Sequence, residues 1–162
     1  MCGMIDLKQH TCSFLGHREI EITEELENRL QKAMEDLICE KKVDTFLFGS
    51  KSAFDRLSLK IVTKCKENYP HIQRIYVRAE YPDIGERYKA YLERYYDDSF
   101  FPEKIRFAGR AVYVERNFEM IRQSRYCIFY FDVKMIPANR KSGTEIALNY
   151  AKRQGRDILL LP

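Results

Sequence analysis

Long apolar runs and the commonest nucleotide-binding signatures are both missing from this sequence. No segment approaches the ~18 consecutive apolar residues of a membrane-spanning helix. Residues 1–6 (MCGMID) do not place a charged segment ahead of an apolar one, as a secretory signal does. The patterns G-x-G-x-x-G and G-x-x-x-x-G-K-[ST] do not occur. The sequence therefore disfavours a membrane protein, a secreted protein, a standard NAD-dependent dehydrogenase and a P-loop NTPase.

The cysteines form no pattern typical of a metal site or a disulfide framework. Their number is odd, they are far apart, and no two form a C-x-x-C pair: Cys2, Cys12, Cys39, Cys65 and Cys127. Disulfide frameworks and zinc sites need cysteines in sets with characteristic spacings. We therefore expect reduced thiols, no metal and a cytoplasmic location. Cys12 and Cys127 lie in apolar segments, where a thiol packs as a small hydrophobic group.

The charge is weakly positive and spread along the chain. The 162 residues are 45% hydrophobic and 32% charged, with a formal net charge of +4, which is ordinary for a globular protein. A chain of this size fits one domain, residues 1–162, with its own core. Because acidic and basic residues are mixed, the sequence indicates no concentrated basic face, and we do not expect a nucleic-acid partner.

Strand-like and helix-like periods alternate through the chain. The predicted strands are residues 11–15, 45–48, 72–79, 126–131 and 157–161. The predicted helices are residues 24–38 behind a Thr23 cap, a second one that ends before residues 69–70, and residues 86–96, 115–124 and 142–154. Residues 97–109 are expected to be irregular, and residues 113–114 to extend a short strand. This alternation predicts an α/β fold: a three-layer, Rossmann-like domain whose mostly parallel central sheet is flanked by helices.

Glycines and polar residues follow several predicted strands. In parallel sheets of this kind, ligands bind beyond the carboxyl ends of the strands, near the point where the strand order reverses. Gly16, His17 and Arg18 follow the first predicted strand, and Gly49 and Ser50 follow the second. We expect these five residues at one ligand-binding rim, with the two glycines opening the floor of the pocket.

A Ser-Gly-Thr turn follows the most apolar strand and begins a helix. The free N–H groups and the positive end of the helix dipole would make this turn an anion site at Ser142, Gly143 and Thr144. Ser142 and Glu145 also match a capping box, in which side chains satisfy the helix's own N–H groups. The two interpretations are compatible, because a serine that caps the free protein can yield the N–H groups to a phosphate.

Arg116 and Asn117 lie just ahead of the same strand. A charged pair at this place is often only a solvated helix start. Alternatively, the planar guanidinium of Arg116 binds a phosphate or ribose, and Asn117 hydrogen-bonds the sugar. Together with the Ser142 turn, this pair indicates a nucleotide-type small molecule as the ligand.

Five separated segments, taken in order, resemble the SLOG superfamily, which unites DprA-like proteins and the LOG phosphoribohydrolases. They are residues 12–18 (CSFLGHR), 46–50 (FLFGS), 54–55 (FD), 115–120 (ERNFEM) and 142–145 (SGTE). The resemblance spans residues 11–161 and is strongest to the small, stand-alone, YpsA-like (DUF1273-like) bacterial members. It implies a Rossmann-like domain that binds nucleotides or nucleotide-derived ligands without a further cofactor, and a homodimer, as in many relatives.

The resemblance also implies a possible reaction. LOG enzymes cleave the N-glycosidic bond of nucleoside 5′-monophosphates, and their E-R-K-x-x-M segment is similar to residues 115–120, which would make Arg116 catalytic or ligand-orienting. The position of the LOG catalytic glutamate, three residues after Thr144, holds Ala147. Glu145 is the nearest carboxylate in the motif, but it lies two positions before residue 147. Two positions correspond to about 200° around a helix, so Glu145 is expected nearly opposite the LOG position.

Three hypotheses follow for the function. The first is a domain that binds or senses a nucleotide-type ligand. The second is an N-glycoside hydrolase (phosphoribohydrolase) that acts on nucleoside monophosphates or ADP-ribose-like molecules. Such an enzyme needs a carboxylate near the anomeric carbon; the candidates are Glu145, Glu80, Glu115 and Asp55. The third is a protein-interaction module.

Overall fold

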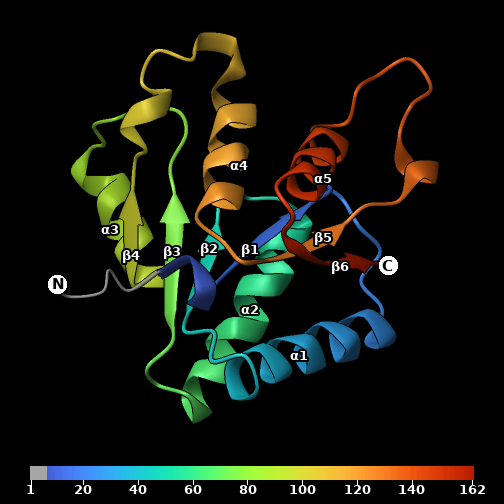
Figure 1. The fold of residues 1–162 in the computed structure, drawn as a ribbon. Coiled ribbons are helices and arrows are strands. Elements are labelled where there is room, and N and C mark those ends of the chain that lie inside the picture. Colours follow the sequence, from blue (N-terminus) through green and yellow to red (C-terminus); the bar gives the residue numbers. More distant parts are fainter. Residues whose placement is uncertain (1–6) are drawn as a thin grey trace, which may run out of the picture.

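The computed structural model describes residues 7–162, beginning with the 3-10 helix η1 (Leu7–His10). Within these residues the chain forms six β-strands and five α-helices (Figure 1). The strands are β1 (Thr11–Gly16), β2 (Thr45–Phe48), β3 (Gln73–Val77), β4 (Asp98–Phe100), β5 (Tyr126–Tyr130) and β6 (Asp157–Leu161). The helices are α1 (Glu24–Cys39), α2 (Ala53–Asn68), α3 (Glu86–Tyr95), α4 (Val112–Arg122) and α5 (Gly143–Arg153). None of these helices is long and apolar enough to span a membrane.

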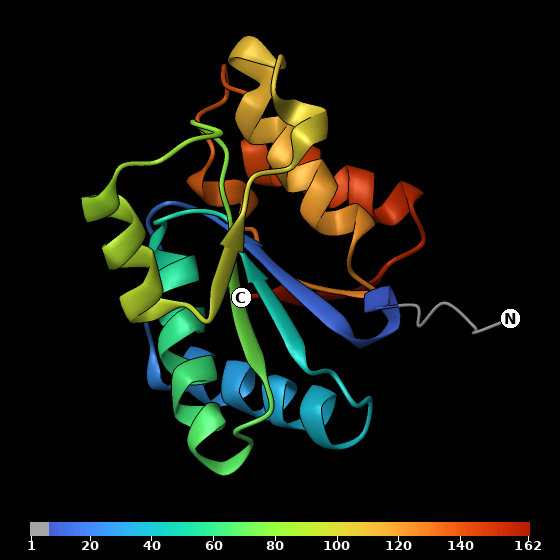
Figure 2. The same cartoon turned by 90° about the vertical axis from the view of Figure 1, so that its left-hand side faces the viewer.

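All strands are parallel and are ordered β4-β3-β2-β1-β5-β6. Helices α1, α2 and α3 pack on one face of the sheet, and α4 and α5 pack on the other (Figures 1 and 2). The predicted three-layer α/β fold is therefore confirmed. The strand order reverses between β1 and β5, so the switch point at which such folds bind ligands lies beyond Gly16 and Tyr130.

Among the described residues, one large hydrophobic cluster on one face of the sheet and two smaller clusters on the other hold the layers together. On the α1–α3 face, the ring of Phe14 stacks on those of Phe46 and Phe48, with centroids 5.8 and 5.0 Å apart. On the α4–α5 face, smaller side chains from β1, β5 and both helices form a second cluster. Cys12 and Cys127 are fully buried, as predicted, and burial raises the pKa of the Cys127 thiol to about 12.

Two sequence predictions for the middle of the chain are wrong. Residues 97–109 were expected to be irregular, but Asp98–Phe100 forms the edge strand β4 beside β3. Asp97 holds this strand in place, because its carboxylate accepts a hydrogen bond of 2.8 Å from the Arg74 backbone N–H and two more from the Arg74 guanidinium. Residues 113–114 were expected in a strand but lie in the first turn of α4, despite their β-forming side chains, because the 3-10 turn Gly109–Ala111 leads directly into this helix.

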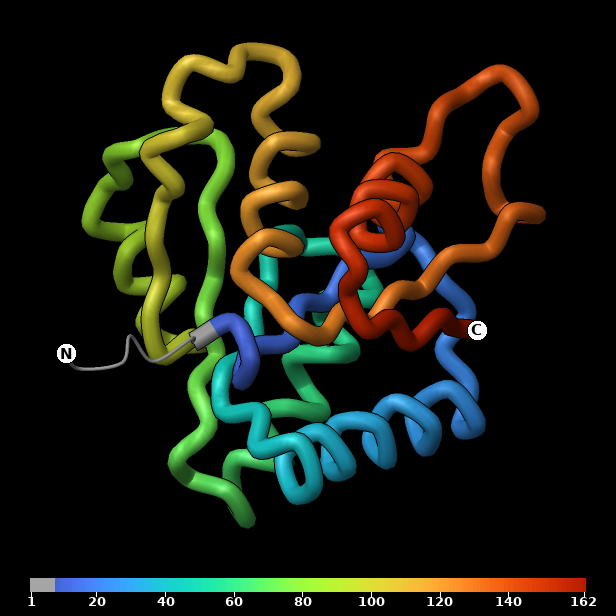
Figure 3. The backbone as a smooth tube through the Cα atoms, viewed as in Figure 1, coloured from blue at the N-terminus to red at the C-terminus, as the bar shows by residue number. Residues whose placement is uncertain are grey.

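The loops that leave the carboxyl ends of the strands are long on one side of the molecule. Figure 3 shows the loop between β4 and α4 and the loop between β5 and α5 projecting from the same edge of the sheet. The first turns of α4 and α5 therefore lie above this edge. Every predicted site residue follows a strand or lies in the first two turns of a helix here, so the fold brings them to one side of the molecule.

Candidate functional site

The loop between β2 and α2 binds a carboxylate of the protein itself. Oδ2 of Asp55 accepts hydrogen bonds from the backbone N–H groups of Gly49 (3.2 Å) and Ser50 (2.8 Å). Ser52 caps α2 by accepting a hydrogen bond of 3.1 Å from the Asp55 N–H. Asp55 is only 3% exposed, and burial raises the pKa of its carboxyl from 3.8 to about 6, although these N–H groups and Arg116 favour the charged form. The amides of Gly49 and Ser50 are therefore occupied.

Arg116 lies directly above this loop. It is 6% exposed, so the interpretation of a solvated helix start is wrong for this residue. Its Nη1 donates to the Gly49 carbonyl, and its Nε donates to Oδ1 of Asn117 over 3.0 Å. Burial lowers the pKa of Arg116, but the guanidinium stays charged at neutral pH, helped by Tyr76 and Asp55. Among residues 7–162, Nη2 has no hydrogen-bond partner.

Gly16 and Gly49 make room for protein side chains. A Cβ atom at Gly16 would lie 2.4 Å from the ring of Phe54, and one at Gly49 would lie 2.8 Å from Cδ and Nε of Arg116. We expected these glycines to open the floor of a pocket. The space beside each glycine is instead filled by a side chain of the protein itself. At Gly49 the consequence still concerns the site, because the missing side chain is what lets Arg116 reach the sheet edge.

Two tyrosines and a glutamate surround the guanidinium. The Tyr113 ring centroid lies 5.8 Å from Cζ of Arg116, within the range of a cation–π contact. The Tyr113 hydroxyl donates a hydrogen bond of 2.8 Å to Oε1 of Glu80, which raises the pKa of Tyr113. Tyr76 is buried, and burial raises the pKa of its hydroxyl. Sequence reasoning missed both tyrosines; the only signal for Tyr113 was its position one helical turn before Arg116.

His17 bridges the two loops at the switch point. Its Nε2 accepts a hydrogen bond of 2.8 Å from the backbone N–H of Asp132, just beyond β5. The neutral ring must then carry its proton on Nδ1, and burial lowers the pKa of this histidine below 6.5. The neighbouring Arg18 is exposed, and its carbonyl accepts a hydrogen bond of 2.7 Å from the Ala53 N–H. Both residues therefore tie the β1–α1 loop to neighbouring elements.

The start of α5 is open to a ligand. The Oγ of Ser142 accepts a hydrogen bond of 3.3 Å from the Glu145 N–H, so the predicted serine cap is confirmed. A Cβ atom at Gly143 would meet nothing within 4 Å. Glu145 is exposed, whereas Ala147 is 1% exposed and packs in the core. The LOG glutamate position therefore faces the sheet in this chain.

The predicted residues form three neighbouring groups along one edge. Gly49, Ser50, Arg116 and Asn117 make the first, Gly16, His17 and Arg18 the second, and Ser142, Gly143 and Thr144 the third. Within the described residues, no hydrogen bond or ion pair joins the third group to Arg116. The helices that carry them are nevertheless packed together, because the rings of Phe118 and Tyr150 stack with centroids 4.1 Å apart.

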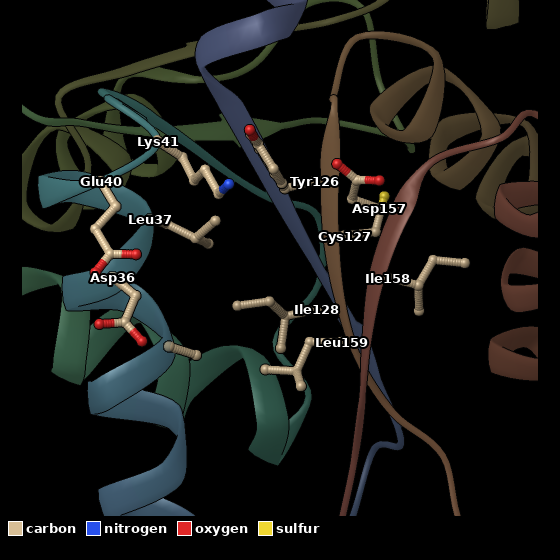
Figure 4. A pocket seen from close by; sticks show the side chains of 11 residues that line it. Asp36, Leu37, Glu40, Lys41, Tyr126, Cys127, Ile128, Asp157, Ile158 and Leu159 are labelled. Atoms are coloured by element: carbon tan, nitrogen blue, oxygen red, sulfur yellow. The ribbon is translucent and has the colours of Figure 1, made fainter.

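Two open surface pockets lie away from the predicted site residues. One, of about 420 Å³, lies between α1 and the first residues of β5 and β6 (Figure 4). The other, of about 430 Å³, lies between α3 and β4. Neither is lined by the predicted site residues. Residues 7–162 also contain no cluster of three or more side chains suited to hold a metal ion.

No family model matches this chain, and no curated protein matches it in a sequence comparison. The fold and the geometry of the carboxyl edge therefore carry the functional argument.

Proposed function

We propose that this protein binds a nucleotide or nucleotide-derived ligand in the cytoplasm, at the carboxyl edge of its sheet, as a SLOG-like domain. The observation that carries the proposal is Arg116, a 6% exposed guanidinium with Nη2 left unpaired among the described residues. Within residues 7–162, Nη2 is not one of the buried side-chain atoms that lack a partner, so this part of the guanidinium is open to solvent and to a ligand. An anionic or ribose oxygen of a ligand would supply the missing acceptor.

The neighbouring groups suit the rest of such a ligand. The N–H groups in the first turn of α5 and the helix dipole favour a phosphate, and the open space at Gly143 lets it approach the backbone. In the neutral tautomer, Nδ1 of His17 offers a donor at the switch point. The Tyr113 ring adds an exposed aromatic surface beside Arg116.

Hydrolysis of an N-glycosidic bond is the alternative, and one observation favours it. Asp55 combines burial with a pKa raised to about 6, as general acids and bases often do. Against this, both N–H groups of its loop hold Oδ2, and the Arg116 charge opposes its protonation. Glu80 is bound by Tyr113, and Glu145 is exposed on α5. The carboxylates are therefore better placed to support the fold than to attack a sugar.

The decisive experiment is calorimetric titration of the protein and its Arg116→Lys variant with AMP, ADP and inorganic phosphate. Lysine keeps the charge but cannot hold Gly49, Asn117 and a ligand oxygen at once. Losing a charge-assisted contact of ~1.5–3 kcal/mol weakens binding by roughly tenfold to a hundredfold.

The matched control is Arg110→Lys, an exposed arginine in the turn before α4. We expect it to leave affinity unchanged. Absence of binding in the parent protein for all three probes would remove the proposal, as would equal affinities for the parent and the Arg116→Lys variant with unchanged melting temperatures.

A further inference from the structure

The outer edge of β6 is a strand edge without a neighbour. β6 is last in the sheet order, and no residue among 7–162 pairs with its far side (Figures 1 and 2). Edge strands are usually protected by charges, proline, bulges or a covering element. β6 begins at the charged Asp157 and is followed by Pro162, but its central residues Ile158, Leu159 and Leu160 carry none of these devices.

The hydrogen bonds to β5 show which backbone groups face outward. The Asp157 N–H donates to the Arg125 carbonyl (3.0 Å), and the Leu161 carbonyl accepts from the Phe131 N–H (2.9 Å). In a parallel ladder, alternate residues direct both backbone groups to the same neighbour. Residues 157, 159 and 161 therefore bond to β5, and the N–H and C=O groups of Ile158 and Leu160 point away from the sheet.

The side chains at this edge are apolar on both faces. Leu160 is 45% exposed, on the same face as Ile158. On the other face, Leu159 and Ile128 line the apolar part of the pocket beside α1, where Figure 4 shows them pointing toward the helix. The one charged residue of the strand, Asp157, is paired with Arg125 over 3.2 Å.

We propose that β6 pairs antiparallel with β6 of a second copy of this chain, so that the two sheets become continuous. The outward groups lie symmetrically on either side of Leu159, so Ile158 of one copy would exchange two hydrogen bonds with Leu160 of the other. Leu159 would then face its own copy across the two-fold axis. Such an isologous contact needs a self-complementary surface, and β6 provides one.

The charges and apolar groups favour a second copy as the occupant. In this register Asp157 lies opposite Leu161, so like charges do not meet along the strand pair. The exposed side chain of Leu160 and the half-buried side chain of Ile158 would cover each other on one face. On the other face, the two apolar grooves beside α1 would adjoin along their Leu159 side.

The first test is the mass in solution, measured by light scattering across a concentration series. We expect twice the 19.4 kDa of one chain. Leu160→Pro removes an outward N–H without touching the ladder to β5 and should give a monomer, whereas Leu160→Ala keeps the N–H and should still form dimers. A parent protein that stays at 19.4 kDa overturns the proposal, and so does a folded Leu160→Pro variant that dimerises like the parent.

A second test remains valid if the proline variant does not fold. Leu159 and its copy would form a non-hydrogen-bonded antiparallel pair with a Cα separation of ~4.5 Å, which a disulfide can span. Leu159→Cys in a Cys2→Ser, Cys39→Ser background should therefore form an intermolecular disulfide on oxidation. The control Glu93→Cys, exposed on α3, should not. A Leu159→Cys variant that remains reduced under the same conditions would contradict the pairing.

Discussion

The side chain of Arg116 occupies the space that a Cβ atom would need at residue 49. An alanine there would bring its Cβ to 2.8 Å from Cδ and Nε of Arg116 and to 2.5 Å from Sδ of Met120. The absence of a side chain at Gly49 therefore determines how closely Arg116 approaches the edge of the sheet, although α2 and α3 separate the two residues in the sequence. This contact makes the position of the proposed ligand-binding group testable without altering Arg116 itself.

Gly49→Ala should destabilise the protein by about 1–3 kcal/mol, as overpacking of a filled interior does. It should also weaken nucleotide binding, because Arg116 has to move. The matched control is Gly143→Ala, where a Cβ meets nothing within 4 Å and stability should be almost unchanged. Urea unfolding of both variants measures the difference, and equal stabilities would contradict the packing at Gly49.

Asp55 should make the stability of the protein depend on pH in acid. Its pKa rises from 3.8 to about 6 on folding, so the native state binds the proton more tightly than the unfolded chain. Stability relative to Asp55→Asn should therefore fall as pH increases from about 4 to about 6, by at most ~3 kcal/mol, and then stay level. Urea unfolding of both proteins across this range is the measurement, and a difference that is constant or grows with pH would refute the shift.

His17 should stay neutral to a lower pH than an ordinary histidine. Because folding lowers its pKa below 6.5, the neutral form is favoured in the native state, and its contribution to stability is lost as pH falls through that lowered pKa. Protonation places a second N–H against the Asp132 amide and breaks the contact. NMR titration should show the Asp132 amide resonance shifting together with the His17 ring signals. Independent titration of the two would show that the contact is not formed.

The first turn of α5 should hold a sulfate or phosphate in crystals grown at high concentrations of either ion. The free N–H groups beyond the Ser142 cap and the space beside Gly143 both favour an anion there. Thr144→Val should reduce the occupancy, because it removes a hydroxyl donor while retaining the shape of the side chain. Crystals without density at this helix start under high sulfate would count against the phosphate site.

The protein should release no ribose 5-phosphate from nucleoside monophosphates at an enzymatic rate. Ala147 is buried in the core, Glu145 is exposed at the helix start, and Asp55 is fixed by two N–H groups. Assays on a panel of monophosphates would use Asp55→Asn, Glu80→Gln and Glu145→Gln for comparison. Turnover near ~1 s⁻¹ that one of these substitutions abolishes would establish the hydrolase instead.

The sequence predicted the elements whose apolar pattern is strong and missed those that tertiary contacts create. β5 is a continuous apolar run, and α1 has an apolar stripe behind its Thr23 cap, so both were identified. β4 has only three residues and depends on the Asp97–Arg74 contact, which no local pattern reveals. The first turn of α4 has strand-like side chains, and only the preceding 3-10 turn makes it helical.

Contacts between distant parts of the chain also limited the prediction of the site from the sequence. The sequence indicated that the predicted residues lie at strand ends, and the parallel sheet brings them to one edge. It did not show that Asp55 already occupies the amides of Gly49 and Ser50, because that contact joins a helix side chain to the loop before it. The burial of Arg116 was also hidden, since the same residue types commonly begin a solvent-exposed helix.

The central position of β1 has a consequence for synthesis of the chain. One edge of Thr11–Gly16 pairs with β2 early in the sequence, but the other edge pairs with β5, and the His17–Asp132 contact that closes this junction spans 115 positions. A nascent chain therefore exposes an apolar, unpaired edge of β1 until β5 has left the ribosome. Chains that terminate before β5 should aggregate or be retained by chaperones, whereas a chain that includes β5 hides this edge inside the sheet.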